Sequence, residues 1–272
     1  IVCASFVHTT SRELDPQAHV HNVLMNMVKR SDGQWRSVES RGIYDDSMLL
    51  GQMFRSNLAP KVLDLGYKID VDTKTGFFEI KEVDRDVIEV FSKRREQIEK
   101  LAEASQVSDA KAMDRLNILS RKAKRAVSKD ELINIWDNEA REINFTPGLL
   151  VKDALDKAKD RSVEKVDHKA DEIVALCAKS LFEMEAVVTR DDLLQKALAV
   201  SVGKFKLSEI DKAINIAIFD KKICVSNIPL ENDKEALTTK EAYRVENYIL
   251  KLANQGRGQK ERITSLSKLD YA

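Results

Sequence analysis

The sequence has few cysteines, prolines and glycines, and no excess of charge of either sign. Its 272 residues include 3 Cys, 4 Pro and 9 Gly, and 45 basic residues balance 45 acidic ones. With 43% hydrophobic and 33% charged residues the chain can bury a core, which excludes a disulfide scaffold and a low-complexity disordered chain. A dedicated nucleic-acid binder usually has a basic excess, so any DNA contact has to come from local patches.

The three cysteines, Cys3, Cys177 and Cys224, are far apart and odd in number. No pair has the spacing of a metal or redox site. We therefore expect small buried side chains and a reducing, cytoplasmic location.

Long hydrophobic runs are also missing. No stretch reaches the roughly 18–20 apolar residues of a membrane helix, so we expect no membrane segment. The apolar run 1–7 opens the chain without Met, and it lacks the preceding basic segment and the length of a signal peptide. We expect a strand that is buried in the full protein and exposed here by the fragment boundary, because upstream sequence is missing.

Residues 1–83 have the pattern of mixed, strand-rich structure. Strands are predicted at 1–7 and 19–28, with apolar residues on both faces as in a covered sheet. The other predicted elements here are a strand at 34–38 after the Asp32-Gly33 turn, a helix at 45–65 that ends at Gly66, and a hairpin of 67–71 with 77–80 around Thr75-Gly76.

Beyond about residue 84 the pattern becomes helical. Helices are predicted at 87–104 and 110–124, and Ser128 with Glu131 forms a capping box for a helix that runs to 143. Pro147-Gly148 breaks the pattern, so we place a boundary between domains 1–147 and 148–272. The second domain has helices predicted over 166–181 and starting at Thr189, Ser208 and Thr238, with a strand at 223–225. The predicted class is α+β: an antiparallel sheet with trailing helices, then a mainly α-helical, winged-helix-like region.

Three of the four histidines lie within 14 residues of one another. His19 and His21 are two apart, so on a strand they point to the same face. His8 closes the preceding strand, and an antiparallel hairpin across 9–17 would set it opposite that pair. Three imidazoles suit a divalent ion of the Zn, Mn, Ni or Co type and leave positions open for a substrate oxygen. Surface or core histidines are the alternative that spacing alone leaves open.

The residues around the histidines resemble the metal-binding signature of TraI/TrwC-type (MobF) conjugative relaxases of the HUH group. The matches are His8, Ser11, Arg12, Asp15, Pro16, Gln17, His19 and His21. Further matches follow at Asn26, Gly33, Trp35, Arg36, Phe54-Arg55, Leu65-Gly66-Tyr67, Phe78-Glu79-Ile80 and residues 91–94. The resemblance implies a relaxase that cuts single-stranded DNA at an origin of transfer through a tyrosine nucleophile. It also implies His8, His19 and His21 as ligands of a divalent Mg, Mn or Zn ion that polarises the scissile phosphate.

No catalytic nucleophile is assigned in this segment. The nucleophilic tyrosines of the family lie near the N-terminus of the full protein, and we expect them upstream. None of the tyrosines here, Tyr44, Tyr67, Tyr243, Tyr248 and Tyr271, matches those positions. The segment alone should therefore not nick DNA.

Arg12, Gln17, Trp35 and Arg36 are the candidate DNA contacts. A loop salt bridge to Asp15 is an equal alternative for Arg12. Gln17 also belongs to the Asp-Pro-Gln stretch, which we expect mainly to fix the turn. Trp35 could stack on a base, but we favour packing in a core. The basic clusters Lys93-Arg94-Arg95 and 121–125 are interpreted as solvated helix faces, and His168 as facing solvent.

The second half resembles, more loosely, the segment that leads into the helicase of TraI-like proteins, at residues 187–194, 207–218 and 237–250. It contains no G-x-x-x-x-G-K-[ST] loop, so ATP is expected only in a helicase part beyond this chain. Implied partners are single-stranded DNA and other relaxosome and conjugation proteins. Two alternatives stay open: a non-catalytic DNA-binding remnant of a relaxase, and an unrelated histidine-metal hydrolase using Glu13 or Asp15 as base.

Overall fold

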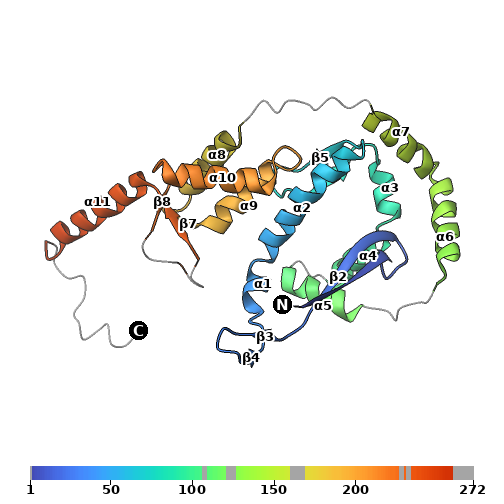
Figure 1. Cartoon of the computed structure of the whole chain (residues 1–272), viewed down its shortest axis with the longest axis horizontal. Coiled ribbons are helices and arrows are strands. Elements are labelled where there is room, and N and C mark those ends of the chain that lie inside the picture. Colours follow the sequence, from blue (N-terminus) through green and yellow to red (C-terminus); the bar gives the residue numbers. More distant parts are fainter. Residues whose placement is uncertain are drawn as a thin grey trace. The chain divides into compact units, whose positions relative to one another are not determined.

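The computed structural model of the chain describes residues 2–105, 109–120, 127–159, 169–226, 230 and 234–259 (Figure 1). Its contacts divide it into two compact units. The first comprises Ile1–Arg41, Val62–Asp70 and Glu79–Ser162, and the second comprises Gly42–Lys61, Val71–Phe78 and Val163–Ala272. Helices and small antiparallel sheets make up both units, which confirms the predicted α+β class.

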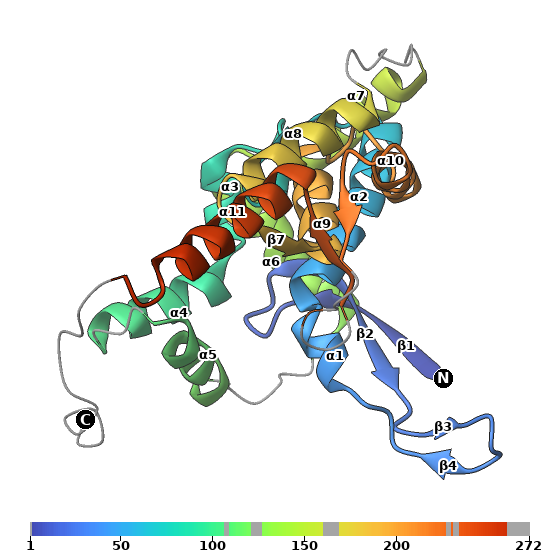
Figure 2. The same cartoon turned by 90° about the vertical axis from the view of Figure 1, so that its left-hand side faces the viewer.

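The first unit begins with two antiparallel hairpins, seen in succession in Figure 2. β1 (Cys3–Thr10) pairs with β2 (Pro16–Leu24), and β3 (Val28–Lys29) pairs with β4 (Trp35–Arg36). The second hairpin turns at Gly33, whose φ of 82° favours glycine. This turn and the short strand after it were predicted.

Among the described residues the β1–β2 sheet lacks the cover that its apolar pattern predicts, and the exposure expected of the 1–7 strand in this segment is confirmed. β1 and β2 form a sheet of two strands, and apolar side chains such as Phe6, Val7 and Val23 are exposed. Continuous apolar strands are typical of sheets buried on both faces. The described part of the chain covers only the loop end of the ribbon, which faces residues 91–99 and Met113.

Helices complete the first unit. They are α3 (Arg85–Val90), α4 (Lys93–Ala104), α5 (Ala110–Leu119), α6 (Lys129–Glu142) and α7 (Pro147–Lys159). The single helix predicted at 87–104 is wrong, because the chain breaks at Phe91-Ser92, where the Ser92 hydroxyl donates to the Ile88 carbonyl. The Ser128 cap is confirmed, since its Oγ accepts from the Glu131 amide at 3.2 Å. Pro147 begins α7, a position where its missing N–H costs nothing.

The chain between the hairpins and α3 follows the local signals in the sequence. It contains α1 (Arg41–Asp45), α2 (Ser47–Asp64), β5 (Ile69–Val71) and β6 (Phe78–Ile80), and β5 pairs with β6. Gly66 has a φ of 91°, and a Cβ there would lie 1.9 Å from the carbonyl oxygen of Ala154. Both the conformation and the close approach therefore require glycine.

Besides most of α2, the second unit contains three helices and a small sheet between residues 170 and 238, and three helices with a strand at 223–225 were predicted for the winged-helix-like region. The helices are α8 (Ala170–Phe182), α9 (Arg190–Val200) and α10 (Leu207–Phe219); the sheet has the order β7 (Val187–Thr189), β9 (Ala236–Thr238), β8 (Cys224–Val225). α11 (Lys240–Gly256) follows β9. Two predicted starts are wrong: α10 begins at Leu207, before Ser208, and Thr239 rather than Thr238 caps α11. The start predicted at 166 lies outside the described residues.

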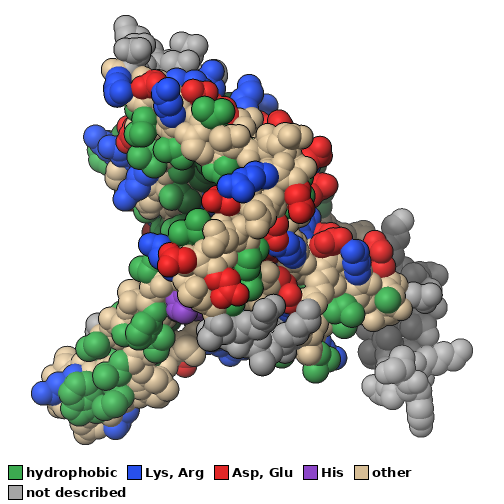
Figure 3. Space-filling model, turned by 90° about the vertical axis from the view of Figure 1, so that its right-hand side faces the viewer, with side chains coloured by type: hydrophobic (Ala, Val, Ile, Leu, Met, Phe, Trp, Pro, Cys, Tyr) green, Lys and Arg blue, Asp and Glu red, His purple; other side chains and the backbone are tan. Residues whose placement is uncertain are grey.

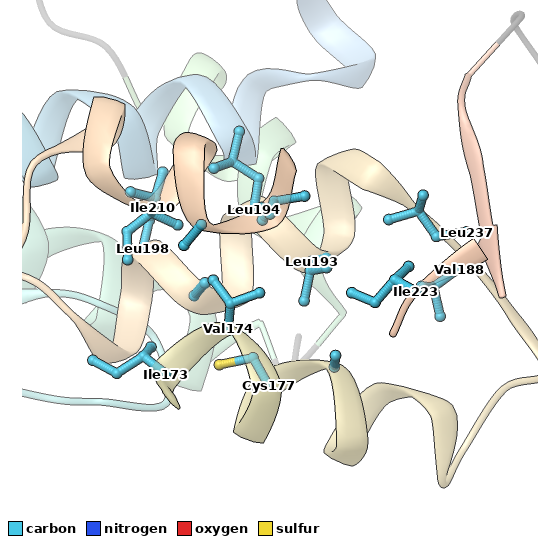
Figure 4. Close-up of a cluster of buried hydrophobic side chains, with 14 of the residues drawn as sticks. Ile173, Val174, Cys177, Val188, Leu193, Leu194, Leu198, Ile210, Ile223 and Leu237 are labelled. Atoms are coloured by element: carbon cyan, nitrogen blue, oxygen red, sulfur yellow. The ribbon is translucent and has the colours of Figure 1, made fainter. Parts of the chain in front are cut away.

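The main hydrophobic cluster lies inside this unit (Figure 4). Leu193 and Leu198 of α9 and Ile210 and Ile214 of α10 have no exposed surface. Buried residues recur at i, i+3 and i+4 on each helix (Leu194, Ala197 and Leu198; Ile210, Ala213 and Ile214), which places one apolar stripe of each helix against α8 and the sheet. Among the described residues, no helix combines the length and apolar character needed to cross a membrane.

The cysteines differ in exposure, which corrects the expectation that all are buried. Cys177 is buried on α8, whereas Cys3 is exposed on β1. Burial raises the pKa of the Cys177 thiol, and the thiolate is the reactive form. We expect iodoacetamide at neutral pH to label Cys3 in the native protein and Cys177 only after denaturation, as followed by peptide mass spectrometry. Equal native labelling of both would contradict this arrangement.

Candidate metal centre

The imidazoles of His8, His19 and His21 lie together on one side of the β1–β2 ribbon. Their ring centroids are 5.4 Å (His8–His19), 4.8 Å (His8–His21) and 5.0 Å (His19–His21) apart. One nitrogen from each ring lies within 4.8 Å of the others. His8 and His19 are half-buried and His21 is exposed. In the space-filling view, histidine is visible at the surface, in purple (Figure 3).

Strand register explains this convergence. His8 lies opposite His19, and Phe6 lies opposite His21. Residues two apart on a strand share a face, so His21 projects beside the His8–His19 pair. A slip of one residue would move His19 and His21 to the other face, so the convergence of the three rings depends on the register.

The main-chain carbonyl of Gln17 orients the imidazole ring of His19. Nδ1 of His19 lies 3.0 Å from the carbonyl oxygen of Gln17, an acceptor only, so Nδ1 is the protonated nitrogen. In this tautomer Nε2 carries the free lone pair. Metal-binding histidines commonly donate their second nitrogen to a carbonyl in this way. This contact could not be predicted from the sequence, because a backbone acceptor has no sequence signature.

An open cavity of about 910 Å³ adjoins the histidines, within the first unit. β1, β2 and the loop between them form one side, and the end of α3 with α4 and α5 forms the other. The lining residues are His8, Thr10, Ser11, Arg12, Leu14, Asp15, Pro16, Gln17, His19, His21, Phe91, Ser92, Arg94, Arg95, Ile98, Glu99 and Met113. Three arginines against two carboxylates give the cavity wall a net positive charge, which suits an anionic ligand.

Asp15 is buried at the edge of this cavity, 3% exposed. Its carboxylate accepts from the Ser11 hydroxyl at 3.0 Å and lies 3.7 Å from Lys93 Nζ. Burial raises the pKa of Asp15, and the Ser11 hydrogen bond and the Lys93 charge act in the opposite direction. Asp15 therefore fixes the loop, in line with the turn role predicted for it.

The four candidate DNA contacts do not come together. Arg12 and Gln17 line the cavity, while Trp35 and Arg36 lie on the β3–β4 hairpin outside its lining. The packing role favoured for Trp35 is wrong, because its side chain is 56% exposed. A two-residue strand in a two-stranded hairpin offers no core to pack into.

The interpretation of Lys93-Arg94-Arg95 as a solvated face is also wrong in part. Lys93 Nζ contacts Glu139 at 2.5 Å and Asp15 at 3.7 Å, and Arg94 donates to Gln97 and Ser120. Arg95 is exposed and pairs with Glu99, as a solvated helix face predicts. The cluster at 121–125 and His168 lie outside the described residues.

A protein-family model described as TrwC relaxase matches residues 1–143, more than half of the chain. The chain belongs to the TrwC relaxase family. The match covers β1, β2, the three histidines and the cavity-lining helices. This confirms the resemblance drawn from the histidine signature.

Individual relatives in the conjugation machinery agree with this assignment. The multifunctional conjugation protein TraI of Escherichia coli strain K12 is 26% identical over 255 residues, 88% of this chain and 14% of that protein. A second Escherichia coli TraI is 29% identical over 154 residues, 53% of this chain and 8% of that protein. This chain therefore spans less than a sixth of the curated relatives it matches.

A solved structure of conjugative relaxase TrwC in complex with oriT DNA, in a metal-free form, has a similar fold. It is 36% identical to this chain, with a TM-score of 0.50. The match covers 53% of this chain and 51% of that one. Similarity in structure therefore agrees with the family assigned from the sequence.

Proposed function

We propose that this chain is part of a conjugative DNA relaxase, and that it supplies the metal site acting on single-stranded DNA at an origin of transfer. The observation that carries the proposal is the convergence of His8, His19 and His21 beside a cavity with arginines in its wall. Family membership supports the reaction class, and the protein similar to it in structure is described as bound to oriT DNA.

We propose a divalent ion, Mg, Mn or Zn, and the three imidazole donors favour Mn or Zn over Mg. Three neutral imidazoles are good ligands for borderline metals, and three protein ligands leave room for a substrate oxygen. When bound, such an ion polarises a phosphate oxygen and stabilises the charge that develops during transesterification. The Gln17 carbonyl keeps His19 in the tautomer whose Nε2 is available.

The cavity wall and the neighbouring hairpin are the proposed DNA contacts. Arg12 and Gln17 lie at the cavity, where a guanidinium can pair with a backbone phosphate. Trp35 and Arg36 stand on the β3–β4 hairpin, and the exposed indole offers a surface on which a base can stack.

The remaining parts of the proposal concern sequence around this chain. The tyrosine nucleophile is proposed upstream, with residues 1–147 forming the C-terminal part of the relaxase domain. Residues 148–272 are proposed to lead into an ATP-dependent helicase. We propose a cytoplasmic protein that acts with relaxosome and conjugation partners. The span of the TraI match, 88% of this chain, supports a common organisation.

Cleavage of single-stranded DNA tests the proposal. A protein carrying its native sequence upstream of Ile1 is expected to cleave an origin-of-transfer oligonucleotide only with Mn²⁺ or Mg²⁺, leaving DNA covalently attached to protein. His19→Ala and EDTA are each expected to abolish the product on denaturing gels, because each removes the metal from the phosphate. Cleavage retained by His19→Ala would exclude a metal-dependent mechanism. DNA binding without any cleavage by the wild type would support the non-catalytic remnant instead.

A further inference from the structure

The loop between the two histidine strands has a fixed internal structure. Ser11 Oγ accepts from the amides of Glu13 (3.2 Å) and Asp15 (3.1 Å) and donates to the Asp15 carboxylate. The Ser11 amide donates to the Asp15 carbonyl at 2.9 Å. Leu14 has a φ of 68°, a conformation that a residue with a Cβ adopts only when its surroundings impose it. The interactions around Leu14, inside the loop and from outside it, must offset the cost of this conformation.

Side chains of α4 and α6 supply the contacts from outside the loop. Trp136 Nε1 donates to the Leu14 carbonyl at 2.6 Å, across 122 residues of sequence. Lys93 Nζ lies between two carboxylates, at 2.5 Å from Glu139 and 3.7 Å from Asp15. Trp136 and Glu139 are three residues apart on α6 and so share a face. All of these groups belong to the first unit.

The ribbon itself cannot secure the register of the histidines. A two-stranded hairpin is marginally stable in water, and the apolar side chains of β1 and β2 are largely exposed. The ladder is also irregular next to the site, because the pairing shifts between His8 and Thr10. Register at the histidine end therefore depends on how the loop is anchored.

We infer that Lys93, Trp136 and Glu139 are positioning residues for the histidine site. They fix the 11–15 loop, and through it the register in which His8 faces His19. Among the contacts that the structure gives for these three residues, none is with an imidazole and none reaches into the cavity. The expected effect on metal affinity rests on the proposed metal-binding function, whereas the anchoring of the 11–15 loop does not.

Metal affinity measures how far the histidine site depends on this anchoring of the loop. In Lys93→Met the buried Asp15 carboxylate and the half-buried Glu139 carboxylate lose the cation between them, so the loop loses its anchor. We expect Zn²⁺ affinity, measured by calorimetry, to fall about 10–100-fold, the range for groups that orient metal ligands. Lys100→Met is the matched control. This lysine is on the same helix and is exposed, and among the ion pairs that the structure gives it pairs only with Glu96. Its replacement should therefore leave Zn²⁺ affinity unchanged.

Hydrogen exchange without metal measures positioning directly. Trp136→Phe keeps an aromatic ring but removes the donor to Leu14. We expect amide exchange at the loop end of β1 and β2 to quicken several-fold in Trp136→Phe and Lys93→Met, but not in Lys100→Met, as followed by NMR. Unchanged exchange in both variants would overturn the inference even if Zn²⁺ binds the wild type. If the wild type binds no Zn²⁺ while exchange quickens as expected, the positioning role stands and the proposed function fails.

Discussion

Replacing His21 with alanine is expected to lower the affinity of the chain for Zn²⁺ or Mn²⁺ by more than about 100-fold. Losing a group that merely orients a ligand costs up to about that factor, and losing a ligand itself costs more. His8→Ala should have the same effect, because the two rings are 4.8 Å apart and contribute equivalent donors. Isothermal titration calorimetry of each variant measures the change.

The fourth histidine provides the matched control. His168→Ala removes one imidazole and leaves His8, His19 and His21 in place. Its affinity should equal that of the wild type. If His8→Ala and His21→Ala also bind metal as the wild type does, the three rings do not form a metal site and the proposed function loses its central observation.

Local chemistry explains what could be predicted of the fold. The starts of α6 and α9 follow from Ser128 and Thr189, whose side chains accept from amides in the first turn. The turns at Gly33, Gly66 and Gly76 all have positive φ, which glycine adopts without strain. These features depend on a few neighbouring residues, so the sequence carries them directly.

Features that depend on distant residues were predicted poorly. Exposure of Trp35 and of the β1–β2 ribbon depends on which elements lie nearby, and apolar pattern alone favours burial. Lys93 looked like part of a charged surface, yet it contacts Asp15 and Glu139. No spacing rule connects residues so far apart in sequence.

The candidate site likewise combines local features, which the sequence predicts, with features that depend on distant residues, which it does not. The histidine positions follow from the period of two along a strand and a hairpin register, both local. The Gln17 carbonyl and the arginines from α4 that line the cavity come from a backbone group and a separate helix, which sequence does not indicate. Spacing alone left a metal role open, and the relaxase resemblance was needed to favour it.

The second large effect concerns stability of the second unit, where Leu198 is fully buried on α9 between α8 and α10. Leu198→Ala removes buried apolar atoms and leaves a cavity, so we expect a loss of about 2–5 kcal/mol in the free energy of unfolding. That is a large part of the roughly 5–15 kcal/mol that stabilises a typical domain. Urea unfolding followed by far-UV circular dichroism measures it. Fluorescence is unsuitable, because Trp35 and Trp136 both belong to the first unit.

The matched control is the same substitution at Leu176, which lies on α8 with 69% of its surface exposed. Both changes place alanine in a helix, so helix propensity contributes alike and the difference isolates burial. Leu176→Ala should shift unfolding by no more than about 0.5 kcal/mol. Equal small effects from both variants would mean that α8, α9 and α10 do not pack around Leu198. In that case the winged-helix-like arrangement of this unit would be wrong, while the histidine site in the first unit would be unaffected by the result.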